Sequence, residues 1–237
     1  MQSPIRWLTL LQDPVDLLGF ALFLLVFPGY HAIYPYLVRL FPAQAAKVRV
    51  DLFRRSWIEG LLERRDIIAA AQQTRNLTMV NSLLASSSLI LMGVTANVLF
   101  RLPEFSQVLA EASSLSRHPD AQAVKLFLLV VVFAVAFAYC MTSLRHLGHF
   151  NLVIGADPEV VRRHEGEPVD YFATLINRAS NRYTLAVRCL YSASPLLLWL
   201  FDQWFFIALT LFWGIKFVCF QDFAHVLRRR AVSSGNE

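Results

Sequence analysis

The sequence predicts an all-α, polytopic membrane protein with four to five transmembrane helices, and two observations lead to this fold class. Hydrophobic residues make up 56% of the chain and charged residues 16%, whereas soluble domains average about 45–50% and 25%. The apolar residues also gather in runs near the length of about 20 residues that a bilayer requires. We therefore expect a single membrane domain over residues 1–237, with spans at about 16–38, 77–99, 124–144, 185–201 and 204–221.

Lysine and arginine are distributed unequally between the segments that join these runs. Segments 39–76, 145–184 and 221–237 hold sixteen of them, whereas the N-terminal tail and the 100–123 connection hold three. Short loops rich in Lys and Arg stay in the cytoplasm. The sequence therefore predicts an inner-membrane protein with its N-terminus outside and its C-terminus cytoplasmic. Because the arginines lie beside spans, they favour contact with anionic lipid over nucleic acid.

The first span, 16–38, contains Pro28-Gly29 and Pro35, where we expect bends. Proline and glycine are tolerated in a span when neighbours satisfy the freed backbone groups. His31 is the only histidine inside a predicted span, and intramembrane ionisable residues are often functional. The structural alternative is a neutral imidazole bonded to a tyrosine hydroxyl or to a carbonyl freed by proline.

An amphipathic cytoplasmic helical segment is predicted at about 45–76. Apolar residues recur there at steps of three and four, the pattern of one helical face: Val50, Phe53, Trp57, Leu61 and Ile68. This helix leads into the second span at 77–99. One continuous helix from 47 to 99 would be about 80 Å long and would project well beyond the membrane.

The second span is rich in small and hydroxylic residues. Ser82 and Ser86 are four residues apart, as are Gly93 and Asn97. Small residues at this spacing let helices approach closely in a membrane. Close helix packing is the first interpretation of the pattern, and a polar pore lining is the second.

The polar 100–123 connection follows, predicted as an external helix and loop, and then the third span at 124–144. A cytoplasmic helical segment is expected at about 158–184, with its main amphipathic helix starting near Asp170. The apolar stretch from Leu185 to Phe220 would be about 54 Å long as one helix, against roughly 30 Å of hydrocarbon. Splitting it at Asp202-Gln203 gives two spans and leaves the C-terminal arginines inside. One long span remains the alternative.

Several short motifs occur in an order that resembles a known family. They are Gly29-Tyr30-His31, Arg54-Arg55-Ser56-Trp57, Gln73-Thr74-Arg75-Asn76, Ser143 with Arg145 and Asn151, and Arg188 with Pro195-Leu196-Leu197-Leu198-Trp199. Together they resemble the domain-of-unknown-function family DUF599 of bacteria and plants, from about Leu17 to Asp222. The resemblance implies a turn at Asp202-Gln203, where plant members have Gly-Pro. It implies no activity, cofactor or site.

Polar residues within and beside the spans are the candidate pathway or ligand residues: His31, Arg75, Asn76, Arg145, Asn151, Arg188 and Lys216. The cytoplasmic arginines could converge, and rings of Arg and Lys suit anion pathways. The convergence set is Arg54, Arg55, Arg75, Arg145, Arg178, Arg182 and Arg188. Each of them could equally meet lipid phosphate or pair locally.

No cofactor, metal or catalytic residue is predicted. The three cysteines form neither a CxxC motif nor a Cys/His cluster with zinc spacing, and no catalytic motif or paired intramembrane carboxylates stand out. A b-type haem is the alternative, since His31 could pair with His146 or His149 as axial ligands.

The leading hypothesis is a homo-oligomeric channel or transporter for a small solute, with an anion as one candidate. Its cytoplasmic helices would form an arginine-lined vestibule in contact with the lipid bilayer. The second hypothesis is a non-enzymatic accessory or scaffold subunit that docks a membrane-complex partner through the 47–76 helix. Whether the protein is an enzyme stays open, and the missing motifs weigh against it.

Overall fold

The computed structural model describes residues 14–42, 45–102 and 119–222, and these residues are helical, with no β-strand among them. The all-α prediction is therefore confirmed. The elements are α1 (Pro14–Leu24), η2 (Leu25–Gly29), α2 (Tyr30–Leu40), α3 (Ala46–Arg64), α4 (Ile67–Phe100), α6 (Pro119–Val153), α7 (Pro158–Glu165), α8 (Pro168–Leu198), α9 (Gln203–Ile215) and η3 (Lys216–Asp222). The first thirteen residues, most of the 100–123 connection and the C-terminal arginines lie outside the described residues.

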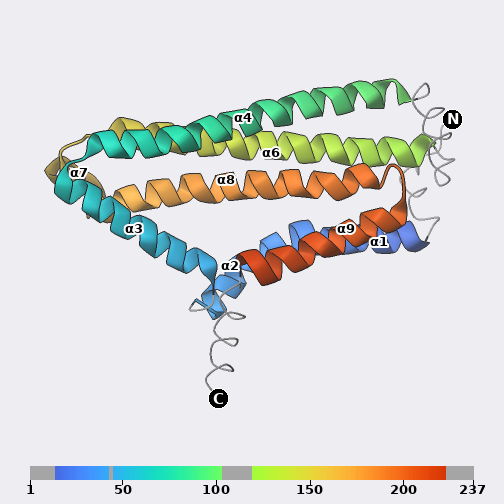
Figure 1. The fold of residues 1–237 in the computed structure, drawn as a ribbon, viewed down its shortest axis with the longest axis horizontal. Helices are drawn as coiled ribbons and strands as arrows, with labels where there is room; N and C mark the ends of the chain where they lie inside the picture. Colours follow the sequence, from blue (N-terminus) through green and yellow to red (C-terminus); the bar gives the residue numbers. More distant parts are fainter. Residues whose placement is uncertain (1–13, 43–44, 103–118, 223–237) are drawn as a thin grey trace, which may run out of the picture.

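Three long helices, α4, α6 and α8, lie side by side with α6 in the middle (Figure 1). The helix formed by α1, η2 and α2 makes a second layer together with α9. At one end of the bundle α7 and the corner between α3 and α4 project beyond this second layer (Figure 1). We call this the α7 end, and the other end, where α8 turns into α9, the turn end.

Three helices are long and apolar enough to cross a membrane: Pro14–Leu40, Ile67–Phe100 and Ala121–Val153. They contain the first three predicted spans and indicate a membrane location. Gln203–Cys219 is apolar but shorter. Length and composition of the described helices thus support three of the five predicted spans.

The first of these helices continues through Pro28 by changing its winding. Leu25–Gly29 forms a π-helical turn, η2, which contains Pro28. A Cβ on Gly29 would lie 2.9 Å from the Leu24 carbonyl oxygen, so only glycine fits there without a shift. The expected bend at Pro28-Gly29 is therefore a widened turn, and such turns are frequent at functional sites.

One continuous helix from 47 to 99, which the sequence left open, is not formed, because the helix is interrupted at Arg65-Asp66. Arg65 has φ 51° and ψ 35°, the left-handed conformation that ends a helix. The Asp66 carboxylate then accepts a hydrogen bond from the Ala69 N–H at 3.0 Å and caps α4. As a result α3 folds back at an angle to α4 (Figure 1).

The apolar stretch from Leu185 to Phe220 breaks where the sequence predicted. Helix α8 ends at Leu198, and α9 starts at Gln203 and runs back in the opposite direction (Figure 1). The Asp202 carboxylate caps α9 by accepting hydrogen bonds from the N–H groups of Trp204 and Phe205, at 2.7 and 3.2 Å. A single helix over this stretch is therefore ruled out.

Two large apolar cores stabilise the fold, with a small cluster of Ala85, Cys140 and Ala186 between α4, α6 and α8. The core at the α7 end contains Ile58 and Leu61 of α3, Phe150 of α6 and Phe172 of α8. Phe53 of α3 lies outside this core and is 71% exposed. The core at the turn end is aromatic and includes Phe23, Phe27, Phe133, Trp199, Phe206 and Phe217.

Helix α4 packs through a polar seam on one face and is open on the other. Thr74, Asn81, Ser88 and Thr95, each seven residues after the one before, are buried. The three hydroxyls donate to backbone carbonyls of α4 itself. By contrast the predicted packing residues Ser82, Ser86, Gly93 and Asn97 are all exposed, so they pack against no other described helix of this chain.

Candidate functional site

A cavity of about 840 Å³ lies between α2, α3, α6 and α8, at the level where the two cores meet. Lysine and arginine dominate its wall, and no Asp or Glu lines it within the described part of the chain. We call it the cationic cavity. Its lining residues are His31, Tyr34, Pro35, Ala46, Lys47, Val50, Arg54, His146, Arg178, Asn181, Arg182, Thr184, Leu185 and Arg188.

His31 and Arg188 form the wall of the cavity that faces the aromatic core. His31 Nδ1 is hydrogen-bonded to the Phe27 carbonyl oxygen, in the widened turn beside Pro28. Arg188 Nη1 lies 3.3 Å from His31 Nε2. A carbonyl can only accept, so Nδ1 carries the proton and Nε2 accepts from the guanidinium. His31 is therefore a neutral imidazole held between a freed carbonyl and an arginine.

Arg188 is buried and lies among aromatic rings. Its exposed fraction is 7%. The guanidinium carbon lies 5.5 Å from the centre of the Tyr34 ring and 5.3 Å from that of Phe217. Cation–π contacts of this kind stabilise a guanidinium that has lost water. The Phe27 carbonyl of η2 orients His31, and the middle of α8 places Arg188 beside it. Two residues that are distant in the sequence thus form one pair.

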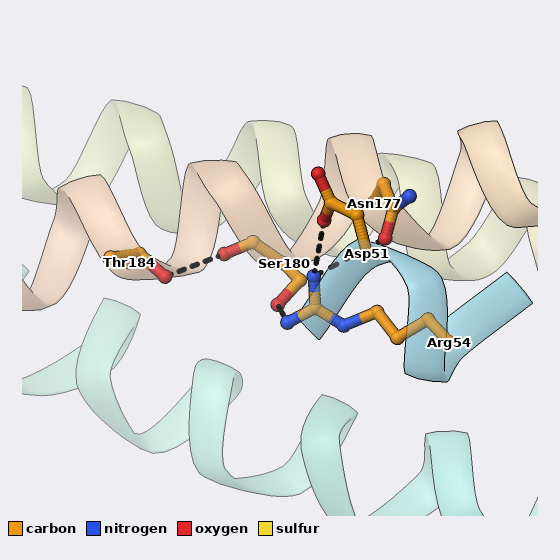
Figure 2. A network of polar contacts seen from close by, with 5 residues as sticks. All are labelled: Asp51, Arg54, Asn177, Ser180 and Thr184. Atoms are coloured by element: carbon orange, nitrogen blue, oxygen red, sulfur yellow. Dashed lines mark hydrogen bonds and ion pairs between the residues drawn. The ribbon is translucent and has the colours of Figure 1, made fainter. Parts of the chain in front are cut away.

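Arg54 fixes α3 to α8 at the opposite wall (Figure 2). Its Nη1 donates to Asn177 Oδ1 at 3.2 Å and its Nη2 donates to Ser180 Oγ at 2.6 Å. Asp51 lies 3.2 Å from the same Nη1 and offsets part of the charge. Burial lowers the pKa of Arg54, and Asp51 raises it in part, but a guanidinium stays protonated at any physiological pH. Arg54 is therefore mainly occupied with positioning α3.

Three further cations line the cavity without a paired anion. Lys47 and Arg178 form no hydrogen bond or ion pair with any residue that the structure describes, and both side chains are exposed. Arg182 lies over the Tyr139 ring, 5.7 Å from its centre, and forms no ion pair with a described carboxylate. Cations that face one space with no carboxylate opposite them create a positive potential, which concentrates anions there.

Of the residues predicted as pathway or ligand candidates, the structure brings His31 and Arg188 together in the cavity. Arg75, Asn76 and Arg145 are exposed and lie outside it. Asn151 accepts a hydrogen bond from Thr74 Oγ1 at 2.6 Å and joins α4 to α6. Lys216 lies over the Trp213 ring, 4.7 Å from its centre.

The cavity also contains one of the histidines considered for haem. His146 lines it together with His31, whereas His149 lies outside and contacts the Tyr171 hydroxyl at 3.2 Å. Because Nε2 of His31 faces Arg188, its lone pair is already engaged. Among the described residues no three His, Cys, Asp or Glu side chains come close enough to hold a metal ion.

A second buried charged group, at the turn end, was missed by the sequence analysis. Lys125 is 1% exposed and lies 3.6 Å from Asp16 and 4.6 Å from the centre of the Trp199 ring. The Trp199 Nε1–H donates to Asp16 at 2.8 Å. The sequence contained one signal for this cluster, because Asp16 and Lys125 carry opposite charges and each lies at the end of an apolar run. This cluster ties α1, α6 and the α8–α9 turn together.

Comparison with known proteins identifies a family and nothing beyond it. No curated protein and no solved structure matches the chain significantly. The model of the family described as "Protein of unknown function, DUF599" matches residues 18–225, close to the range that the resemblance covered. The chain therefore belongs to the DUF599 family of proteins of unknown function.

Proposed function

We propose that this protein is a membrane protein that binds an anion in the cationic cavity, as the binding site of a channel or transporter. The observation that carries the proposal is the wall of the cavity. Lys47, Arg178 and Arg182 face it without a carboxylate among the described lining residues. Arginine presents a planar set of donors that matches phosphate and carboxylate oxygens.

The proposal places the cavity at the inner face of the membrane. We take all five apolar segments as spans, with the arginine-rich α7 end in the cytoplasm. The apolar core around Trp199 and Phe206 then lies within the bilayer, and the core around Phe150 and Phe172 lies beyond it. The cavity, which separates the two cores, would lie at the depth of the inner headgroups, where a soluble anion can enter.

The cavity supports an anion site within one chain rather than between subunits. Its walls come from four helices of the same protein. A homo-oligomer stays part of the proposal, with the open face of α4 as the contact. Ser82, Ser86 and Asn97 on that face are polar and exposed, and polar groups facing lipid favour helix association. A monomeric mass in native mass spectrometry from lipid would contradict this contact.

The first test is a double substitution, Arg178→Gln with Arg182→Gln, in the full-length protein reconstituted into liposomes. Loss of two cations is expected to weaken binding of inorganic phosphate and sulfate about tenfold or more, since each charge-assisted hydrogen bond is worth about 1.5–3 kcal/mol. Flux of the bound anion should fall in parallel. Radiolabelled anion binding and liposome uptake measure the two effects.

The matched control is Arg64→Gln with Arg163→Gln, which removes the same charge from exposed helix positions outside the cavity. It is expected to bind anions like the parent protein. If both double variants lost binding equally, general charge would explain it and the cavity would not be the site. If the parent protein bound no anion, the proposal would be wrong.

The haem alternative has one observation in its favour, because His31 and His146 line the same cavity. The Arg188 contact at His31 Nε2 opposes it, since iron would have to displace the guanidinium. A Soret band in the absorbance spectrum of the purified protein would favour the haem alternative, and a missing band would contradict it.

The scaffold alternative rests on the outer face of α3. Leu52 and Phe53 are 58% and 71% exposed there, and a partner or the membrane surface could cover them. A partner recovered in equal amount with the wild-type protein, but not with Phe53→Ser, would favour a scaffold role.

A further inference from the structure

An apolar groove of about 530 Å³ runs along the surface between the first helix and the last. Elements α1, η2 and α2 form one side of it, and α9 and η3 form the other. The two sides touch at its floor, where a Cβ on Gly214 would lie 3.2 Å from a Val26 methyl carbon. The lining residues are Leu22, Leu25, Val26, Tyr30, Ile33, Leu211, Gly214, Ile215, Phe217, Val218 and Cys219.

The groove adjoins the cationic cavity. Tyr30 lines the groove, and the next residue, His31, lines the cavity. Phe217 lines the groove as well. Its ring centre is 5.8 Å from that of His31 and 5.3 Å from the Arg188 guanidinium carbon. The apolar groove and the cationic cavity therefore lie next to each other, with Phe217 of the groove in contact with His31 and Arg188 of the cavity.

The groove is open on the side that would face lipid. Leu25, Ile33 and Ile215 on its rims are 69%, 55% and 58% exposed. A small anion dissolved in water needs only the cavity and gains nothing from this surface. A molecule with a charged head and an apolar tail would use both, because burying each methylene stabilises the bound state.

We infer that the occupant of the cavity is an anionic lipid, with its phosphate among Lys47, Arg178 and Arg182 and one acyl chain along the groove. This inference rests on the proposed anion site and specifies its ligand. Several unpaired cations suit a phosphate, which carries more charge and more acceptor oxygens than a carboxylate. The depth of the cavity in the proposed membrane placement is also that of lipid phosphates.

The test compares inorganic phosphate with two alkyl phosphates that differ only in chain length. Inorganic phosphate, ethyl phosphate and octyl phosphate are titrated into the full-length protein in a neutral detergent, and their dissociation constants are compared. The octyl ester is expected to bind about tenfold more tightly than the ethyl ester, which is a conservative gain for six added methylenes when detergent competes for the tail.

Val218→Trp fills the groove without replacing any residue of the cavity, and Val94→Trp adds the same bulk on the open face of α4. Val218 is 42% and Val94 57% exposed, so both positions accept a larger side chain. The Val218→Trp protein should bind ethyl phosphate normally and lose the preference for the octyl ester. The Val94→Trp protein should keep the preference.

The possible failures are distinguishable. If octyl and ethyl phosphate bind equally well, the lipid inference is wrong and the anion site stands. If the preference for the octyl ester survives Val218→Trp, the chain does not lie in the groove and the inference is likewise overturned. If none of the three phosphates binds, the proposed function itself is wrong.

Discussion

At the scale of single residues, Arg54 and Arg55 are neighbours in the sequence with different surroundings. Arg54 is half-buried and donates to Asn177 and Ser180 of α8 (Figure 2). Arg54→Ala leaves these acceptors and Asp51 without their donor. We expect it to lower the free energy of unfolding by about 1.5–3 kcal/mol, the usual contribution of hydrogen bonds to a charged group. Unfolding in mixed micelles measures the loss.

Arg55→Ala is the control for that prediction. Arg55 donates to Asp170 at 2.8 Å, but both side chains are more than half exposed. Water screens such a pair, so its removal should change stability little. Equal losses in the two variants would contradict the assignment of Arg54 as the residue that fixes α3 to α8.

The sequence could predict part of the candidate site at this scale. His31 and Arg188 stood out because ionisable residues inside apolar runs are rare. Arg75 and Arg145 could not be separated from Arg178 and Arg182, because only the rotation of each helix in the bundle decides which arginines share a cavity. Lys125 was missed because it stands out only when Asp16 is known to lie opposite it. The two residues are more than a hundred positions apart in the sequence, and only the fold brings them together.

At the scale of elements, the corner between α3 and α4 depends on Arg65 in a left-handed conformation. A residue other than glycine destabilises the fold by about 1–2 kcal/mol when it adopts this conformation. Arg65→Gly is therefore expected to raise the free energy of unfolding by about 0.5–1 kcal/mol, after the entropy that glycine adds to the unfolded chain. Arg64→Gly, one residue earlier at the last position of α3, should lower it, because glycine is the poorer helix former. Opposite changes in the free energy of unfolding of the two variants would support the left-handed conformation of Arg65 at the corner. A loss of stability in both variants would contradict it.

The two helix breaks in this chain differ in how far the sequence could predict them. Asp202-Gln203 interrupts a long apolar stretch with polar residues, and the length of that stretch already required a break. At Arg65-Asp66 the surrounding residues are charged and contain neither glycine nor proline. The break there follows from packing, since the fold-back lets Ile58 and Leu61 of α3 reach the core around Phe150.

At the scale of the whole molecule, the uneven distribution of arginine coincides with the division of the fold into two cores. The arginine-rich segments 39–76 and 145–184 supply α3, α7 and much of the core at the α7 end. The sequence therefore predicted which parts of the chain gather at one end. It could not predict that they form a packed unit, because the contact residues only become neighbours through the corner at Arg65.

The same division predicts the orientation of the protein in the membrane, which single cysteines can test. Phe201→Cys places a thiol at the turn end and Ala156→Cys places one at the α7 end, and both positions are exposed. In intact cells the thiol at 201 should react with a membrane-impermeant maleimide, and the thiol at 156 should react only after the membrane is opened. The parent chain corrects for the native Cys140, Cys189 and Cys219. The reverse result would put the arginine-rich end outside, and with it the cationic cavity, so a soluble anion would then reach the site from outside the cell.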